Sequence, residues 1–76
     1  MLQMRPNCER CDRDLVADEP GAWICSFECT FCAACVEGDL KRRCPNCKGD
    51  LVQRPTRERA LWAKHPPSTE RVRKSP

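Results

Sequence analysis

The sequence predicts a small, irregular α+β domain that bound metal, rather than a large apolar core, holds together. Two observations predict this class. The chain has 76 residues, of which 39% are hydrophobic and 33% are charged, so it buries too little apolar surface to offset its conformational entropy unaided. It also contains eight cysteines, all between Cys8 and Cys47. Cysteines clustered in a short chain act as cross-links, through disulfides or through metal.

The compartment decides between disulfides and metal. Disulfides persist in oxidising compartments, which proteins reach through a secretory signal. Residues 1–7 have neither an apolar h-region nor a small-residue cleavage site. No apolar run approaches the roughly 18 residues that a membrane span requires. We therefore expect a soluble, cytoplasmic protein without membrane contact, whose thiols stay reduced and bind metal.

The cysteines form four pairs with the spacing of zinc ligands. Along the chain the pattern is Cys8-x2-Cys11-x13-Cys25-x3-Cys29-x2-Cys32-x2-Cys35-x8-Cys44-x2-Cys47. Two intervening residues let the backbone fold into a tight knuckle that directs both sulfurs at one tetrahedral ion, about 2.3 Å away. Eight ligands make two four-sulfur sites, which leave no position for water and are structural rather than catalytic. We therefore expect two zinc ions and no enzymatic activity.

The metal and the sharing of ligands each have an alternative. Iron fits the same sulfurs, either as an iron–sulfur cluster or as a rubredoxin-like single ion, and would make this a redox protein. Sequential sharing joins the first four cysteines at one site and the last four at the other. Interleaved sharing joins Cys8, Cys11, Cys32 and Cys35 at site 1 and Cys25, Cys29, Cys44 and Cys47 at site 2. Spacing alone leaves both open.

The predicted cysteine-rich domain spans residues 1–53 and contains little regular structure. We expect short strands at Trp23-Ile24 and Leu51-Val52, and a helix over residues 33–41. In the last knuckle, Gly49 is predicted to take a left-handed conformation as the chain leaves the metal. Four apolar side chains are predicted to form a miniature core between the two metals: Trp23, Ile24, Phe27 and Phe31.

The composition changes at Arg54, where a basic tail is predicted to begin. Residues 54–76 have a net charge of +5 and residues 1–53 a net charge of −2. Eight thiolates and two zinc ions bring the loaded domain to about −6, so the sequence pI of 8.5 is weak support for nucleic-acid binding. A short helix is expected over residues 57–64, and disorder after Pro66-Pro67.

Two segments resemble the RING finger signature. They are Cys29-Thr30-Phe31-Cys32-Ala33-Ala34-Cys35-Val36 and Cys44-Pro45-Asn46-Cys47. In RING fingers an aromatic residue precedes the fifth ligand, an apolar residue follows the sixth, and the last pair reads Cys-Pro-x-Cys. Cys29 stands where most RING fingers have His. The resemblance covers Cys8 to Cys47 and implies a RING-like cross-brace zinc fold, with a LIM-like fold of sequential zinc sites as the alternative.

RING fingers are best known for recruiting ubiquitin-conjugating enzymes, but the contact residues match poorly. Their surface usually has an apolar residue between the first two cysteines, an aromatic residue near the helix and a cation after the eighth ligand. Here Glu9 and Arg10 fill the first knuckle, the helix region has no Trp, and Lys48 alone matches. A ubiquitin-ligase-like adaptor is therefore an alternative to a general protein-interaction module.

The whole chain also resembles a small cysteine-rich bacterial family of unknown function. Its members share Cys-Ser-Phe-Glu-Cys-Thr-Phe-Cys, which is residues 25–32 here. This resemblance implies a bacterial cytoplasmic context and no particular activity.

The functional prediction is a non-enzymatic zinc-binding module that mediates protein–protein interaction. The candidate partner-binding residues are Trp62, Lys41, Arg42, Arg43 and Lys48. A nucleic-acid-binding zinc protein is the alternative, in which residues 41–43 form a basic patch together with Arg71, Arg73 and Lys74 of the tail. His65 is surplus to two complete sites and is predicted to be solvated.

Overall fold

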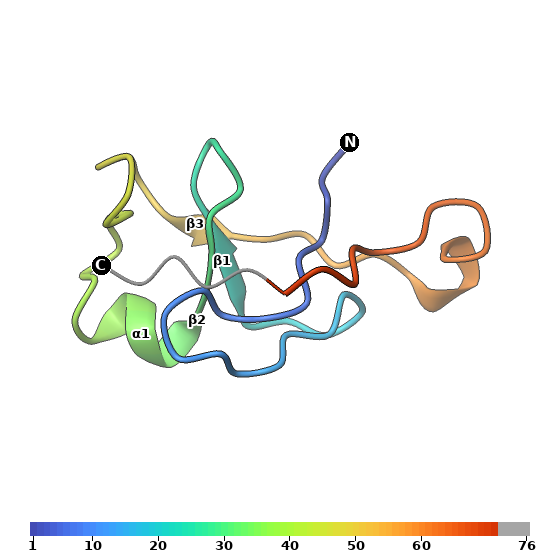
Figure 1. The fold of residues 1–76 in the computed structure, drawn as a ribbon, viewed down its shortest axis with the longest axis horizontal. Helices are drawn as coiled ribbons and strands as arrows, with labels where there is room; N and C mark the ends of the chain where they lie inside the picture. The colour runs from blue at the N-terminus through green and yellow to red at the C-terminus, as the bar shows by residue number, and fades with distance from the viewer. Residues whose placement is uncertain (72–76) are drawn as a thin grey trace.

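The computed structural model describes residues 1–71, and its sheet is antiparallel with three short strands (Figure 1). Strand β1 comprises Ala22–Ile24, β2 comprises Thr30–Cys32 and β3 comprises Val52–Gln53, in the spatial order β2-β1-β3. The strand predicted at Trp23-Ile24 is confirmed. The closing strand is also present, one residue later than predicted.

The helix α1, Ala33–Glu37, follows β2 directly and is shorter than the predicted range of 33–41. Gly38 ends it, because its backbone leaves the helical region at φ −87° and ψ −104°. Beyond this point the Leu40 N–H donates to the Cys35 carbonyl, five residues back, so the chain unwinds. Leu40 nevertheless packs against the same core as the fully buried Val36, as the sequence predicts for one face.

The core consists of cysteines and a few apolar side chains. Phe31 is fully buried, Ile24 and Leu51 are nearly so, and Trp23 packs at the edge. These positions confirm three of the four predicted core residues. The small size of this cluster agrees with a fold that needs cross-links in addition to apolar burial.

Phe27 is an exception, and its prediction as a core residue is wrong. Its side chain is 72% exposed. Phe27 lies in the turn between β1 and β2, where its backbone N–H is 3.3 Å from Cys25 Sγ. Because this contact fixes the turn around the sulfur, the Phe27 side chain projects into solvent.

Residues 54–71 fold back onto the rest of the chain. Arg54 is 6% exposed, and its N–H donates to the Ala22 carbonyl at 2.8 Å. The Arg57 N–H donates to the Ala17 carbonyl at 2.8 Å. The packed structure therefore continues beyond residue 53.

The predicted helix over residues 57–64 is reduced to a single 3-10 turn, Arg59–Leu61. Glu58 before it is extended, with φ −57° and ψ 136°, and caps nothing with its side chain. The helix therefore begins no earlier than Arg59. The predicted disorder falls in part on residues 72–76, including Arg73 and Lys74, which lie outside the described residues. Within residues 1–71, no helix has the length and apolar character needed to cross a membrane.

Candidate metal centre

The first cluster joins thiols from two distant segments. The Sγ atoms of Cys8, Cys11, Cys32 and Cys35 all lie within 4.8 Å of one another. The Cys8–Cys35 and Cys11–Cys32 sulfur pairs are 3.8 Å and 3.6 Å apart. Sulfurs bound at about 2.3 Å to one tetrahedral ion lie about 3.8 Å from each other. The spacing of these four sulfurs therefore fits one tetrahedral metal ion.

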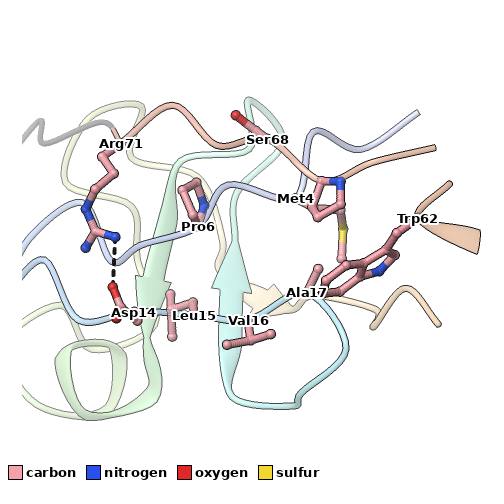
Figure 2. Close-up of a pocket in the computed structure, with 10 residues that line it drawn as sticks. Met4, Pro6, Asp14, Leu15, Val16, Ala17, Trp62, Ser68 and Arg71 are labelled. Carbon is pink, nitrogen blue, oxygen red and sulfur yellow. Dashed lines mark hydrogen bonds and ion pairs between the residues drawn. The ribbon is translucent and has the colours of Figure 1, made fainter. Parts of the chain in front are cut away.

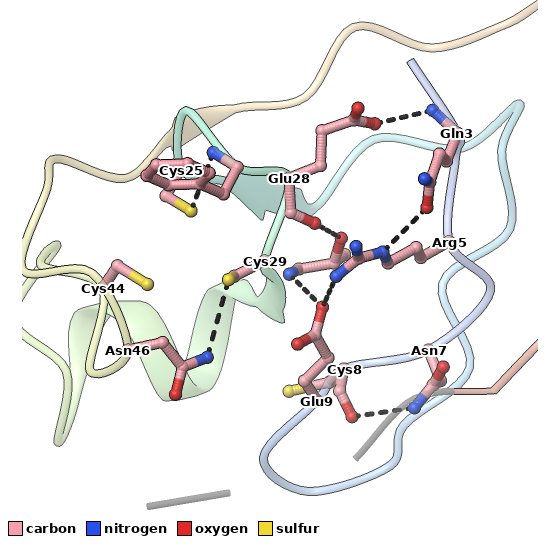
Figure 3. A network of polar contacts seen from close by, with 12 residues as sticks. Gln3, Arg5, Asn7, Cys8, Glu9, Cys25, Glu28, Cys29, Cys44 and Asn46 are labelled. Carbon is pink, nitrogen blue, oxygen red and sulfur yellow. Dashed lines mark hydrogen bonds and ion pairs between the residues drawn. The ribbon is translucent and has the colours of Figure 1, made fainter. Parts of the chain in front are cut away.

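The second cluster is formed by Cys25, Cys44 and Cys47, whose sulfurs also lie within 4.8 Å of one another. Cys29 lies at the edge of this group, where its thiol interacts with those of Cys25 and Cys44. The Asn46 side-chain amide donates to Cys29 Sγ at 3.5 Å (Figure 3). Cys29 is therefore the candidate fourth ligand of the second cluster.

The first knuckle, Cys8 to Cys11, and the last knuckle, Cys44 to Cys47, have the same backbone turn. The Asp12 N–H donates to the Cys8 carbonyl, and the Lys48 N–H donates to the Cys44 carbonyl, each at 2.9 Å. Asp12 and Lys48 are both left-handed, with φ 65° and φ 67°. A two-residue spacing therefore produces one turn geometry at both places.

The prediction of a left-handed Gly49 is wrong, because Lys48 takes that conformation instead. Gly49 has a different role. Its N–H lies 3.4 Å from Cys47 Sγ, and a Cβ at this position would also be 3.4 Å from that sulfur. The backbone N–H of Gly49 therefore faces the Cys47 sulfur.

Backbone amides favour the ionised form of one thiol in each cluster. Burial raises the pKa of Cys8, but N–H groups of Cys11, Cys32 and Arg10 outweigh it and lower the pKa to about 7. Burial also opposes ionisation of Cys25, whose pKa is lowered by nearby backbone N–H groups. These thiols are the best prepared to bind a cation near neutral pH.

Other thiols in the clusters ionise only with help from a cation. Burial, together with the neighbouring thiols, raises the pKa of Cys35 to about 12. Burial raises the pKa of Cys44 to about 12, although backbone amides oppose it. A divalent ion removes the proton from a coordinating thiol. The donor chemistry and the sulfur spacing thus both fit a metal, and each cluster has the ligands to hold one ion.

The candidate partner-binding residues fall on two separate surfaces. Lys41, Arg42, Arg43 and Lys48 are exposed and belong to the loops around the second cluster. The Arg42 guanidinium lies 5.7 Å from the centre of the Trp23 ring, and Arg43 Nη1 donates to the Lys48 carbonyl at 3.0 Å. The turn that carries Trp62 lies at the opposite end of the molecule (Figure 1).

Trp62 is half-buried and held by its own segment. Its indole N–H donates to the Arg57 carbonyl at 3.0 Å, and the Arg59 guanidinium lies 4.4 Å from the ring centre. Figure 2 shows Trp62 beside Met4 and Ala17 on an open groove of about 290 Å³. At the other end of this groove Arg71 pairs with Asp14 at 2.8 Å (Figure 2).

His65 is exposed, as predicted, and belongs to neither cysteine cluster of residues 1–71. Glu9 is a site residue that sequence reasoning missed. It lies between two ligands of the first cluster and is fully buried. Arg5, four residues earlier, pairs with it at 2.7 Å. An arginine at this spacing before a carboxylate is the sequence signal that points to such a pair.

The fold and the thiol clusters together define a small cysteine-rich domain with two groups of thiols able to hold metal ions. The chain belongs to the family described as a protein of unknown function (DUF1272), whose model matches residues 1–57. It is 58% identical over 74 residues to an uncharacterized protein of Rhizobium meliloti (strain 1021), covering 97% of this chain and 88% of that protein. No solved structure matches the chain. The resemblance to a small bacterial family of unknown function is confirmed.

Proposed function

We propose that this protein is a non-enzymatic module with two structural zinc ions, and that it mediates protein–protein interaction. The first ion is bound by Cys8, Cys11, Cys32 and Cys35. The second is bound by Cys25, Cys29, Cys44 and Cys47. The observation that carries the proposal is the grouping of the first four sulfurs within 4.8 Å of one another.

The same grouping supports a RING-like cross-brace over LIM-like sequential sites. In a sequential arrangement Cys25 and Cys29 would share an ion with Cys8 and Cys11. Instead the sulfur of Cys25 groups with those of Cys44 and Cys47. Strand β2 then directly follows Cys29 of the second site and ends at Cys32 of the first, so one short segment serves both ions.

A structural role follows from the coordination. Four sulfurs leave no position at which the metal can hold water or substrate, and all eight cysteines are used as ligands. Metal binding then contributes folding free energy on the order of 10 kcal/mol per site, which compensates for the small apolar core. Zinc is favoured over iron because closed four-cysteine sites of this spacing are typical structural zinc sites.

The interaction surface in this proposal is the exposed basic group around the second site: Lys41, Arg42, Arg43 and Lys48. The exposed Phe27 belongs to the same end, because its amide contacts the Cys25 sulfur of that site. Positive charge beside an exposed aromatic ring favours an acidic protein surface with an apolar contact. The same charges make nucleic acid the second candidate partner.

Elemental analysis tests the metal. Purified protein should contain two zinc ions per chain, and a chelator should remove the structure together with the zinc. Cys32→Ser should lose metal and unfold, whereas His65→Ala, the matched control, should retain both ions. A coloured protein containing iron, a fold that persists without metal, or a requirement for His65 would contradict the proposal.

A pull-down from the native cell tests the surface. A variant that lacks residues 54–76 would not test the surface alone, because Arg54 and Arg57 are part of the packed structure. The variant Lys41→Glu/Lys48→Glu should lose the captured protein, and Lys64→Glu, at the opposite end, should keep it. Binding of nucleic acid with an affinity that falls steeply with salt would favour the second candidate. Loss of the captured protein in Trp62→Ala alone would place the surface at the groove instead.

A further inference from the structure

We propose that Glu9 is a positioning residue that couples the two metal sites, so that the chain takes up both ions together. This inference rests on the proposed metal-binding function. It goes further because it assigns cooperativity to one buried carboxylate that binds neither metal.

Glu9 joins the first knuckle to strand β2 through a two-way contact with Thr30. The Thr30 N–H donates to Glu9 Oε2 at 2.7 Å, and the Glu9 N–H donates to the Thr30 carbonyl at 2.8 Å. Arg5 Nη1 donates to the same Oε2 at 2.7 Å (Figure 3). The carboxylate is therefore fixed from both the strand and the N-terminal segment.

Thr30 lies between a ligand of the second site and a ligand of the first. Thr30 directly follows Cys29, a ligand of the second site, and precedes Cys32, a ligand of the first, by two residues. A bond to the Thr30 amide therefore holds the segment on which both sites depend. When the second ion orders Cys29, it also presents the Thr30 amide to Glu9 and so helps to place Cys8 and Cys11.

Because the Glu9 side chain is buried, a state in which only some of its contacts have formed is unfavourable. The Glu9 side chain is completely inaccessible, and its Oε1 has no hydrogen-bond partner within residues 1–71. A buried carboxylate is unfavourable unless its charged hydrogen bonds are in place. Because Oε1 has no partner among residues 1–71 even in the folded structure, a chain with one site formed and the other open would leave the buried carboxylate with only its Arg5 contact at Oε2. The half-loaded state is therefore disfavoured relative to the empty and fully loaded states.

The arginine that compensates Glu9 is itself held in place. Arg5 Nε donates to Gln3 Oε1 at 3.1 Å, and Arg54 Nη1 donates to the Arg5 carbonyl at 2.8 Å. Arg54 is buried. The Glu9–Arg5 pair is thus part of the packed interior, where a charge pair is screened less by solvent than at the surface.

Native mass spectrometry of the full chain, loaded with one equivalent of zinc after chelation and reduction, tests the coupling. The parent protein should show mainly empty and two-zinc chains. Glu9→Gln should still reach two zinc ions at excess metal, but should populate the one-zinc form. The ratio of its stepwise affinities should change on the order of tenfold. Glu37→Gln, which alters an exposed carboxylate on α1, should resemble the parent.

Each result is decisive. A substantial one-zinc population in the parent, or the same distribution in Glu9→Gln and the parent, would overturn the coupling. So would weaker uptake by Glu9→Gln without a one-zinc form, because a merely structural residue would lower both affinities together. If Glu9→Gln takes up no zinc, Arg5→Lys, which keeps the carboxylate, is judged by the same criterion. A parent chain that binds no zinc would instead refute the proposed function.

Discussion

Arg54 donates a hydrogen bond of 2.8 Å from its Nη1 to the carbonyl oxygen of Arg5, although 49 positions separate the two residues. Arg54 Nη2 also reaches the Leu15 carbonyl at 3.4 Å. Burial lowers the pKa of the Arg54 guanidinium, so this cation has exchanged part of its hydration for backbone acceptors. The residue after the predicted boundary thus connects three segments of the fold.

Replacing Arg54 with Ala should lower the free energy of unfolding by about 2 kcal/mol, because two partly buried carbonyl groups lose a charged donor. Urea unfolding at a fixed excess of zinc measures this change. Arg59→Ala is the control, since Arg59 makes an exposed pair with Asp18 and a surface contact with the Trp62 ring, and exposed pairs contribute little. Equal losses in the two variants would contradict a special role for Arg54.

Phe31 and Phe27 should respond very differently to truncation. Phe31→Ala should lower the free energy of unfolding by about 3–5 kcal/mol, because it removes a fully buried ring from a small core. Phe27→Ala should change it by about 0.5 kcal/mol or less, as expected for an exposed position. Thermal unfolding of the two zinc-saturated variants makes the comparison. A large loss for Phe27→Ala would show that its ring is buried in solution.

Asn46 should support metal binding without being a ligand. Its amide donates to the Cys29 sulfur, and Cys29 is the thiol at the edge of the second cluster. Loss of a hydrogen bond to a ligand typically lowers metal affinity by about 10-fold or more. Competition with a chromophoric zinc chelator should therefore show weaker binding of one of two ions in Asn46→Ala. Gln53→Ala, an exposed change on β3, should leave both affinities unaltered.

Replacing Lys48 with glycine should stabilise the protein. A residue with a side chain is strained in the left-handed region by roughly 1 kcal/mol, and Lys48 lies there at φ 67°. Lys48→Gly should raise the free energy of unfolding by up to about 1 kcal/mol in zinc-saturated protein, measured with urea. Lys64→Gly should lower it, since Lys64 does not have a positive φ. Destabilisation by both changes would argue against strain at Lys48.

The short strands and the pairing of thiols follow closely from the sequence. Strand β1 was predictable because Trp23-Ile24 leads directly into Cys25. The close approach of thiols was predictable because a spacing of two or three residues folds into a tight turn. The pattern could not choose between sequential and interleaved sharing, because both satisfy every local spacing. The sharing depends on tertiary features, such as the antiparallel pairing of β1 with β2, that no local spacing records.

The remaining differences also have tertiary causes. Phe27 was expected in the core because it is aromatic, but the turn around Cys25 directs it outward. The domain was expected to end at residue 53, because the composition becomes basic and polar from Arg54. Arg54 and Arg57 instead donate to backbone carbonyls of Arg5 and Leu2, and no pattern within the tail reveals such acceptors. Glu9 was missed for the same reason, since its partner Thr30 is 21 residues away.

The matching first and last knuckles have one more consequence. They share the same turn bond, and the flanking bridges Asn7–Asp14 and Arg43–Asp50 frame them alike. Their inner residues nevertheless differ completely in charge and shape. The same backbone turn therefore forms around two different pairs of inner residues. The inner residues instead connect each knuckle to the rest of the molecule, as Glu9 does with Thr30 and Asn46 does with Cys29.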